Sequence, residues 1–176
     1  MTTIAYDGKT LAADSASFLG DNFRIGCGAK KLVILHSKVF AFAGNYVLSG
    51  PWMQWFLNGH DPEKKPGGVR ENDDDLDMWV WSAGQLFQYT STMPYPWPVP
   101  VPFAMGSGGD FAMGAFRFGE VSGVPVSAEQ AVLAAIACDP FSGGPVQVVD
   151  LPRNAPYDGH IQIHPDPKLQ QKADAA

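Results

Sequence analysis

The sequence has few cysteines, no long apolar segment and no basic run, and each absence excludes a class of protein. Its two cysteines, Cys27 and Cys138, are too few for a disulfide framework and form no CxxC pair, so we assign them no chemistry. No stretch approaches the roughly 18 apolar residues that a membrane-spanning helix needs, and the N-terminus lacks the basic and apolar regions of a signal peptide. We therefore predict a cytoplasmic protein with no membrane partner.

Charge and composition narrow the class further. The formal net charge is -6, the pI is near 5.0 and no run of Lys or Arg occurs, so an electrostatic nucleic-acid surface is not expected. Hydrophobic residues make up 45% of the chain and charged residues 17%, as in ordinary soluble globular proteins. A length of 176 residues suits one domain with a real core.

Three patterns that suggest ligand sites lack the residues that such sites need. The acidic run at residues 73–75 does not have the spacing of a calcium-binding loop. His160 and His164 lack the glutamate of a zinc-binding HExxH motif, and the glycine-rich run 106–109 matches neither phosphate-binding glycine motif. We predict no metal ion and no cofactor.

Two hairpins are predicted in the first 44 residues. If Asp7 and Gly8 form the loop of the first, Thr2 faces Ala13 and Asp14 lies beside the N-terminus. The second runs from residue 30 to 44 around a weaker turn at residues 37–38. Counting outward from that turn places Lys31 opposite Gly44.

The remaining pattern predicts further strands and three helices. A third hairpin is expected over 78–82 and 85–90, a proline-rich extended connector over 94–102, and a strand over 145–151. Helices are expected over 48–57, 107–118 and 127–138, the last beginning with a capping box of Ser127 and Gln130 and the second ending at Gly119. Residues 60–77 are expected to form a polar loop. This order predicts an α+β fold of antiparallel sheets covered by helices.

Six short motifs follow one another in a fixed order along the chain. They are Thr2-Thr3-Ile4, Ala12-Ala13-Asp14-Ser15, Lys30-Lys31, Ala43-Gly44, Gly106-Ser107-Gly108-Gly109 and Asp139-x-x-Ser142-Gly143-Gly144. Together they resemble the proteasome β-type subunits and their HslV-type relatives, which belong to the N-terminal-nucleophile (Ntn) hydrolases. The resemblance covers roughly residues 2 to 151.

The resemblance implies a fold and its boundaries. It implies a four-layer αββα sandwich, in which helices cover two antiparallel sheets, formed by a single domain over residues 1–151. Residues 152–176 would then be a C-terminal extension with a flexible end. The segment between Gly44 and Met78 is shorter than in this family, where two substantial helices lie, so we expect a shortened helical layer after residue 44.

The resemblance also implies a set of site residues. Those that match the family's catalytic positions are Thr2, Asp14, Lys31, Gly44, Ser107, Asp139 and Ser142. Thr2 matches the nucleophile, which requires removal of Met1, and Gly44 matches the backbone N–H that binds the oxyanion. Asp14 and Lys31 match the charged pair beside the nucleophile, and the last three match a supporting network around its amine. By the same alignment the substrate pocket comprises Ser17, Ala29, Val33, Phe42 and Tyr46.

The implied chemistry is physically consistent. A threonine hydroxyl is a poor nucleophile until a base takes its proton, and the free α-amine of the same residue, with a pKa of ~7.7 to 8, can be that base. The expected function is a threonine-type peptidase that cleaves polypeptides inside a self-assembled ring or spiral, and the resemblance also allows an ATPase unfoldase as partner. The alternatives are a non-catalytic assembly subunit and an amidase that acts on small amides.

Overall fold

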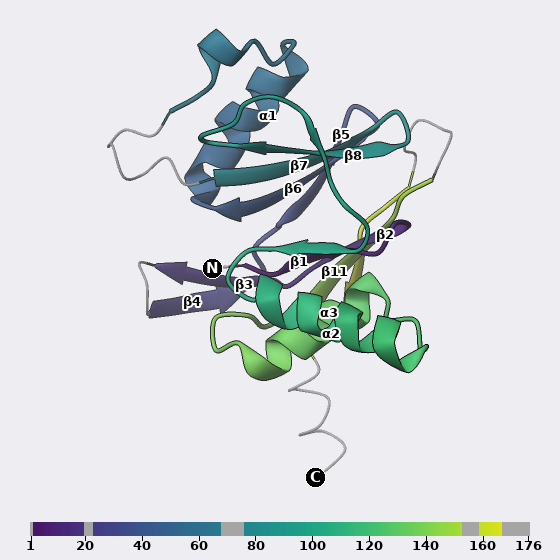
Figure 1. Cartoon of the computed structure of the whole chain (residues 1–176). Coiled ribbons are helices and arrows are strands. Elements are labelled where there is room, and N and C mark those ends of the chain that lie inside the picture. The colour runs from purple at the N-terminus through teal and green to yellow at the C-terminus, as the bar shows by residue number, and fades with distance from the viewer. Residues whose placement is uncertain (1, 20–22, 68–75, 153–158, 167–176) are drawn as a thin grey trace.

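The computed structural model describes residues 2–19, 23–67, 76–152 and 159–166. Figure 1 shows two sheets stacked on each other, with α1 (Ser49–Leu57) on the outer side of one sheet and α2 (Gly109–Ser122) and α3 (Ala128–Cys138) on the outer side of the other. Among the described residues, no helix has the length and apolar character needed to cross a membrane.

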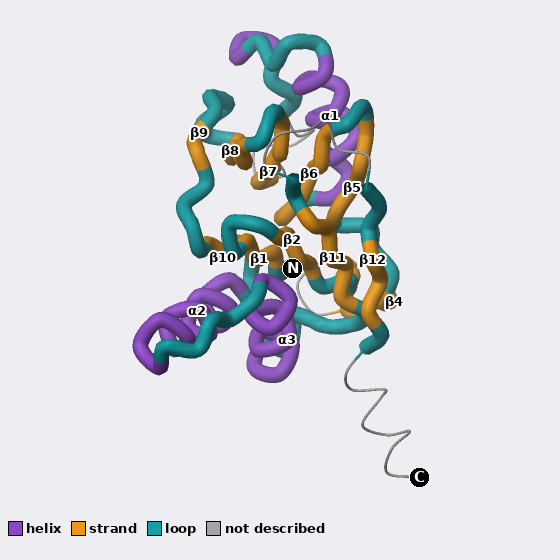
Figure 2. Tube along the Cα trace, turned by 90° about the vertical axis from the view of Figure 1, so that its right-hand side faces the viewer, coloured by secondary structure: helices purple, strands orange, loops and turns teal. Residues whose placement is uncertain are grey.

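The first sheet carries the N-terminus. Its strand order is β10-β1-β2-β11-β12, and every neighbouring pair is antiparallel. Strands about 100 residues apart in the sequence, such as β1 and β10, therefore lie side by side (Figure 2). The bounds are β1 Ile4–Tyr6, β2 Thr10–Ala13, β10 Phe103–Met105, β11 Val146–Asp150 and β12 Gln162–His164.

The second sheet is also antiparallel, with the order β5-β6-β7-β8-β9. A separate two-stranded ribbon of β3 and β4 connects the two sheets in the sequence. The bounds are β3 Ala16–Leu19, β4 Phe23–Cys27, β5 Leu32–Leu35, β6 Lys38–Gly44, β7 Leu76–Ser82, β8 Gln85–Thr90 and β9 Trp97–Pro98.

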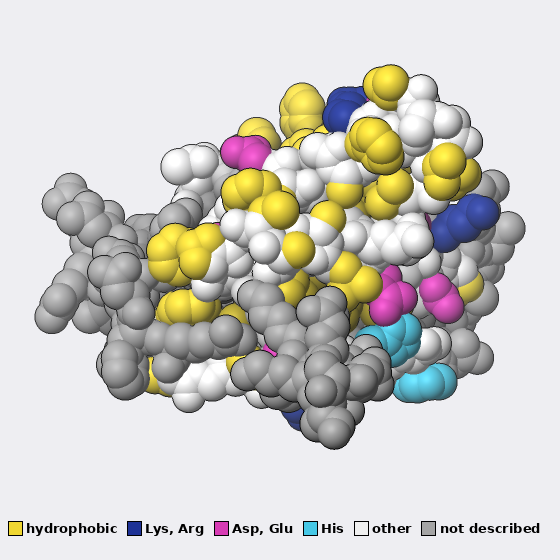
Figure 3. All heavy atoms as spheres, turned by 90° about the horizontal axis from the view of Figure 1, so that it is seen from below, with side chains coloured by type: hydrophobic (Ala, Val, Ile, Leu, Met, Phe, Trp, Pro, Cys, Tyr) yellow, Lys and Arg dark blue, Asp and Glu magenta, His cyan; other side chains and the backbone are white. Residues whose placement is uncertain are grey.

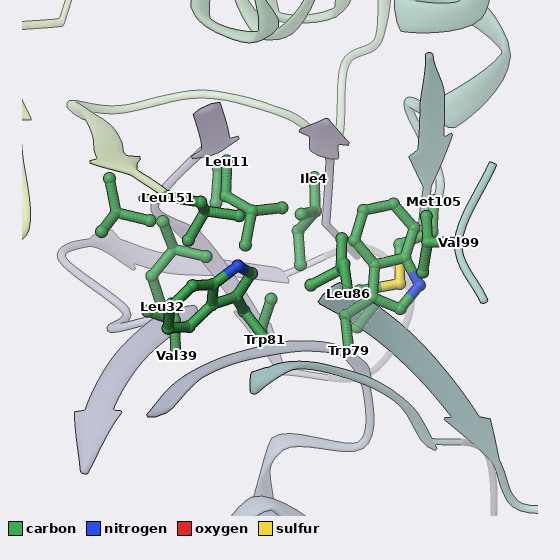
Figure 4. Packing of buried hydrophobic residues seen from close by; sticks show 14 residues of the cluster. Ile4, Leu11, Leu32, Val39, Trp79, Trp81, Leu86, Val99, Met105 and Leu151 are labelled. Carbon is green, nitrogen blue, oxygen red and sulfur yellow. The ribbon is translucent and has the colours of Figure 1, made fainter. Parts of the chain in front are cut away.

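Three hydrophobic clusters separate the layers, as alternation along the strands requires. The cluster between the sheets contains alternate residues of facing strands, among them Ile4, Leu11, Trp79 and Trp81 (Figure 4). A second cluster joins the first sheet to α2 and α3, and a third joins the second sheet to α1. The layer order is helix, sheet, sheet, helix, which confirms the predicted four-layer αββα sandwich.

The predicted helices are present, with one corrected end. The capping box of Ser127 and Gln130 starts α3 as predicted, and α1 is the only α-helix among the described residues of the segment 45–75, in agreement with a shortened helical layer. Two 3-10 turns, Tyr46–Leu48 and Pro62–Lys64, flank it. However, α2 runs past Gly119 to Ser122 and ends at Gly123, whose φ of 71° is left-handed. Gly119 instead lets the Val126 side chain pack against α2, because a Cβ at residue 119 would lie 2.7 Å from it.

The predicted registers of the first two hairpins are each wrong by two residues. In the first, Ile4 faces Ala13, because the loop residues are Gly8 and Lys9 rather than Asp7 and Gly8. In the second, Leu35 faces Lys38 across a turn at residues 36–37, where both φ values are positive. An even shift keeps every side chain on its predicted face of the sheet, so the layers are unaffected.

The C-terminal segment contributes to the first sheet. β12 pairs with β11, with Val146 opposite His164, so part of the predicted extension after residue 151 belongs to the sheet. His164 also contacts the Glu129 carboxylate on α3. The third hairpin lies where predicted, around residues 83–84. The acidic run 73–75 and residues 167–176, where a flexible end is predicted, lie outside the described part of the chain.

Candidate active site

The residues assigned to catalysis by the sequence, apart from Gly44, come from five parts of the chain and meet at the start of β1. Thr2 and Thr3 precede β1, Asp14 follows β2, and Lys31 precedes β5. Two loops complete the set, namely the segment before α2 with Ser107 and the segment after α3 with residues 139–144.

Asp14 is the central acceptor of the site. Its side chain is fully buried, and a buried carboxylate is stable only when charges and donors satisfy its oxygens. Four donors do so: the amide of Thr3 at 2.8 Å, the amide of Gly143 at 3.0 Å, the amide of Ala16 at 3.2 Å and the Lys31 ammonium at 2.6 Å. Asp14 thereby ties the residue after Thr2 to Lys31.

Lys31 is held in a buried ion pair with Asp14. Its side chain is 4% exposed, and its Nζ is 2.6 Å from Asp14 Oδ1. Burial lowers the pKa of Lys31 below its ordinary value of 10.5, because a cation loses its hydration there, while the charge of Asp14 and its hydrogen bond oppose the shift. Asp139 and Cys27 oppose it at longer range. Burial and the Asp14 charge therefore act on the pKa of Lys31 in opposite directions, and burial has the larger effect.

This electrostatic balance predicts how Lys31 titrates. We expect NMR titration of the Lys31 side chain in the folded protein to show a pKa below 10.5, and Asp14→Asn to lower it further by removing the main opposing charge. Between the lowered pKa and 10.5 the folded chain binds fewer protons than the unfolded chain. The contribution of Lys31 to stability should therefore rise with pH across that window. A pKa of Lys31 that rises in Asp14→Asn would contradict this account.

A network of hydroxyls joins the Thr2 nitrogen to a buried carboxylate. The Thr2 N–H donates to Ser107 Oγ at 3.1 Å, and Ser107 Oγ lies 3.3 Å from Asp139 Oδ2. Ser142 Oγ donates to the same carboxylate oxygen at 2.7 Å. Since that donation uses the Ser142 proton, the Thr3 hydroxyl donates to Ser142 Oγ across 2.5 Å. The structure thus brings these predicted residues together.

The glycines around Ser107 allow the backbone to approach Thr2 closely. A Cβ on Gly106 would lie 2.1 Å from the Thr2 carbonyl oxygen, and φ at Gly106 is +89°. A Cβ on Gly108 would lie 2.0 Å from the Thr3 hydroxyl. Only glycine fits at these two positions, which explains why a glycine-rich motif that matches no phosphate loop stands here.

Gly44 is the last residue of β6, the strand that pairs with β5. The amide of Phe42 donates to the Lys31 carbonyl at 3.1 Å, so Gly44 lies two residues beyond the position opposite Lys31, rather than opposite it as predicted. Its φ is +99° and the residue is exposed. It faces Leu76 in the β6–β7 ladder, and its role as oxyanion donor stays a prediction.

The five predicted pocket residues differ in exposure. Phe42 is 2% exposed and stacks on Phe40 in the cluster under α1, so it belongs to the core rather than to an open surface. Val33 packs against the same cluster. Ser17 and Ala29 are half-buried and Tyr46 is exposed. Whether these residues contact a substrate stays a prediction.

Three contacts of the site were missed by the sequence analysis. The Thr3 hydroxyl contacts Ser142, which donates to Asp139, and the Gly143 amide donates to Asp14. Gln147 makes four further hydrogen bonds to the backbone around Asp14 and Lys31. The available signal was Gln147 itself, because it is the one polar residue in the otherwise apolar run of residues 146–149.

Comparison with known proteins gives a fold. No protein-family model and no curated protein sequence matches the chain. Among solved structures, eukaryotic HslV from Trypanosoma brucei superposes with a TM-score of 0.62 at 24% identity, over 85% of this chain and 98% of that one. BPH from Thiobacillus denitrificans gives 0.59 at 20% identity, over 87% and 99%, and BPH in complex with epoxomicin gives 0.61 at 18% identity, over 88% and 99%. The chain therefore shares the fold of these HslV and BPH structures.

Proposed function

We propose that this chain is a threonine-type peptidase subunit in which Thr2, freed by removal of Met1, is the nucleophile. The observation that carries the proposal is the buried Asp14–Lys31 pair, which is fastened to the residue after Thr2 by the Thr3 amide. A fully buried ion pair is costly to desolvate and is weak support for stability alone. Beside the hydroxyl and amine of processed Thr2, the pair can instead serve the reaction by placing a positive charge next to the nucleophile.

The proposed reaction uses two functional groups of one residue. The α-amine of processed Thr2 takes the proton from its own Oγ, and the oxygen attacks the substrate carbonyl. The Lys31 ammonium favours the neutral form of the amine and stabilises the developing alkoxide, and Asp14 holds that ammonium charged and oriented. The Gly44 N–H binds the oxyanion, a type of donor whose loss typically costs ~2.7 to 4 kcal/mol. The amine then protonates the leaving amine, and water hydrolyses the acyl ester.

The hydroxyl network sets the position of the amine. Ser107 Oγ is 3.1 Å from the Thr2 nitrogen, so it would hold the α-amine after processing. Asp139 orients Ser107 and Ser142 through its Oδ2, while its Oδ1 accepts from the Phe141 amide at 3.0 Å. A fixed donor and acceptor arrangement removes rotational freedom from the base before the substrate arrives, which is the physical advantage of such a network.

We further propose that the chain acts as a homo-oligomer on polypeptides in the cytoplasm, with an ATPase unfoldase as a possible partner. Apolar side chains gather on the face that α2 and α3 present, as Figure 3 shows. Phe118, Val121 and Val124 at the end of α2 are 71%, 89% and 63% exposed. Large exposed apolar patches on a protein surface favour association, which supports assembly through surfaces of this kind.

The proposal is tested by the state of the N-terminus. We expect intact mass and N-terminal sequencing of the purified protein to show Thr2 as the first residue, and a panel of fluorogenic peptides to be cleaved. Epoxomicin, which one of the similar BPH structures holds, should add to the N-terminal peptide of the processed protein. A retained Met1 in protein that cleaves no peptide would favour a non-catalytic assembly subunit, and cleavage of small amides alone would favour an amidase.

A further inference from the structure

Gln147 is a buried polar residue in a row of apolar ones. Along β11, Val146 and Val148 pack toward α3, whereas Val149 and Leu151 pack between the sheets. Alternation places Gln147 on the face between the sheets, where its side chain is almost fully buried. An amide in that position is costly unless every polar atom is paired, so its retention there needs a reason.

The reason lies in the four hydrogen bonds of its amide. Gln147 Oε1 accepts from the Lys31 amide at 3.1 Å and from the Leu32 amide at 3.3 Å. Gln147 Nε2 donates to the Ala29 carbonyl at 2.7 Å and to the Asp14 carbonyl at 3.3 Å. These bonds use both donors and both acceptor positions of the side chain. They reach the backbone of both members of the buried ion pair.

The two members of that pair come from different sheets. Asp14 follows β2 of the first sheet, and Lys31 precedes β5 of the second, after the β3–β4 ribbon. Residues 28–31 before β5 are not in a strand, and their backbone is held by the Ser15 carbonyl, which accepts from the amides of Gly28 and Ala29, and by the Phe42 amide, which donates to the Lys31 carbonyl. Gln147 adds the constraint that joins the two, from a strand paired on both sides by β2 and β12, because it holds the Ala29 carbonyl and the Lys31 amide as well as the Asp14 carbonyl.

We propose that Gln147 is a positioning residue for the reaction, which fixes the backbones of Asp14 and Lys31 so that their side chains meet beside Thr2. The inference rests on the proposed function. Gln147 acts through the ion pair and touches neither the nucleophile nor its network. Loss of this constraint misplaces the Lys31 ammonium, and a misplacement on the order of 1 Å can reduce turnover by roughly 100-fold.

The test compares Gln147→Met, which keeps the shape and removes all four hydrogen bonds, with Val148→Ala. Val148 is a neighbour on β11 that is also buried but packs toward α3, so its truncation destabilises the strand without touching residues 29–32. We expect Gln147→Met to lower kcat for a fluorogenic peptide by roughly 100-fold with little change in KM. Val148→Ala should lower the melting temperature and leave kcat within about twofold. If Gln147→Met does not fold, Gln147→Glu replaces it, since Glu keeps the acceptor bonds and loses the donors to the two carbonyls.

A second readout separates this inference from the proposed function. An amine-reactive reagent, followed by peptide mass spectrometry, reports how accessible and how basic Lys31 is without any turnover. We expect labelling of Lys31 to change by at least about tenfold in Gln147→Met and to stay unchanged in Val148→Ala. Unchanged labelling and unchanged kcat in Gln147→Met would overturn the inference while leaving the peptidase intact. A wild-type protein that cleaves no peptide would overturn the function, and the labelling would still decide whether Gln147 positions Lys31.

Discussion

Thr2→Ala is expected to abolish peptide hydrolysis, with a loss of at least about 10³-fold in kcat. The substitution removes the only hydroxyl that the proposed mechanism uses as nucleophile, and it keeps the nitrogen that donates to Ser107. Thr2 is only 4% exposed, so stability is measured beside activity to separate a loss of the nucleophile from a loss of fold. The measurement is kcat and KM with the peptides that the wild type cleaves, together with a thermal melt.

Two further variants give the control for Thr2→Ala. Thr2→Ser keeps a hydroxyl on the same carbon and should retain part of the activity. Thr10→Ala removes the hydroxyl of a threonine in β2 that donates to the Asp150 carboxylate at 3.0 Å, away from the candidate site, so it should leave kcat unchanged. Peptide cleavage by Thr2→Ala at the wild-type rate would show that Thr2 is not the nucleophile and would reject the proposed mechanism.

Asp14→Ala is expected to be among the most destabilising substitutions in this protein. Three backbone amides and one ammonium, all in the buried site, lose their acceptor together. Each unsatisfied buried donor costs about 1 to 3 kcal/mol, and breaking a buried ion pair costs about 3 to 5 kcal/mol. Since these losses overlap, we expect a fall of about 4 kcal/mol or more in the free energy of unfolding, measured by urea denaturation.

Asp150→Ala is the matched control for this loss. Asp150 lies on the same sheet, is exposed and accepts from the Thr10 hydroxyl, so its removal should cost less than about 1 kcal/mol. Lys31→Met should fall between the two, because Asp14 then keeps its three backbone donors. If Asp14→Ala were as stable as Asp150→Ala, the buried pair would not hold the two sheets together at this site.

Local signals in the sequence determined most of the elements. The Ala83-Gly84 turn and the capping box at Ser127 each act within a few residues, and both produced the predicted structure. The Asp7-Gly8 signal located a hairpin but not its register, because Gly8 is the first loop residue and Asp7 accepts from the amides of residues 9 and 10. A turn signal therefore predicts where the chain reverses direction, but it predicts less well which residues of the two strands pair.

The order of the short motifs predicted the members of the candidate site, but their contacts depend on packing. Thr3 and Ser142 are 139 positions apart in the sequence, and Lys31 and Gln147 are 116 apart. No local rule relates residues at such separations. The wrong placement of Lys31 opposite Gly44 has a different, local cause: the turn lies at residues 36–37 rather than 37–38, so Lys31 faces Phe42.

The sequence by itself predicted antiparallel sheets covered by helices and the capping box that starts α3, because alternation and capping act between near neighbours. The resemblance carried by its six motifs implied the four layers and the residues gathered around Thr2. Only the tertiary structure decided that Asp14 binds the Thr3 amide, that Phe42 is core, and that Gln147 joins Asp14 to Lys31. The physical reason is that a buried polar group must find its partners wherever two sheets and two loops happen to meet. Those partners are fixed by packing rather than by spacing along the chain.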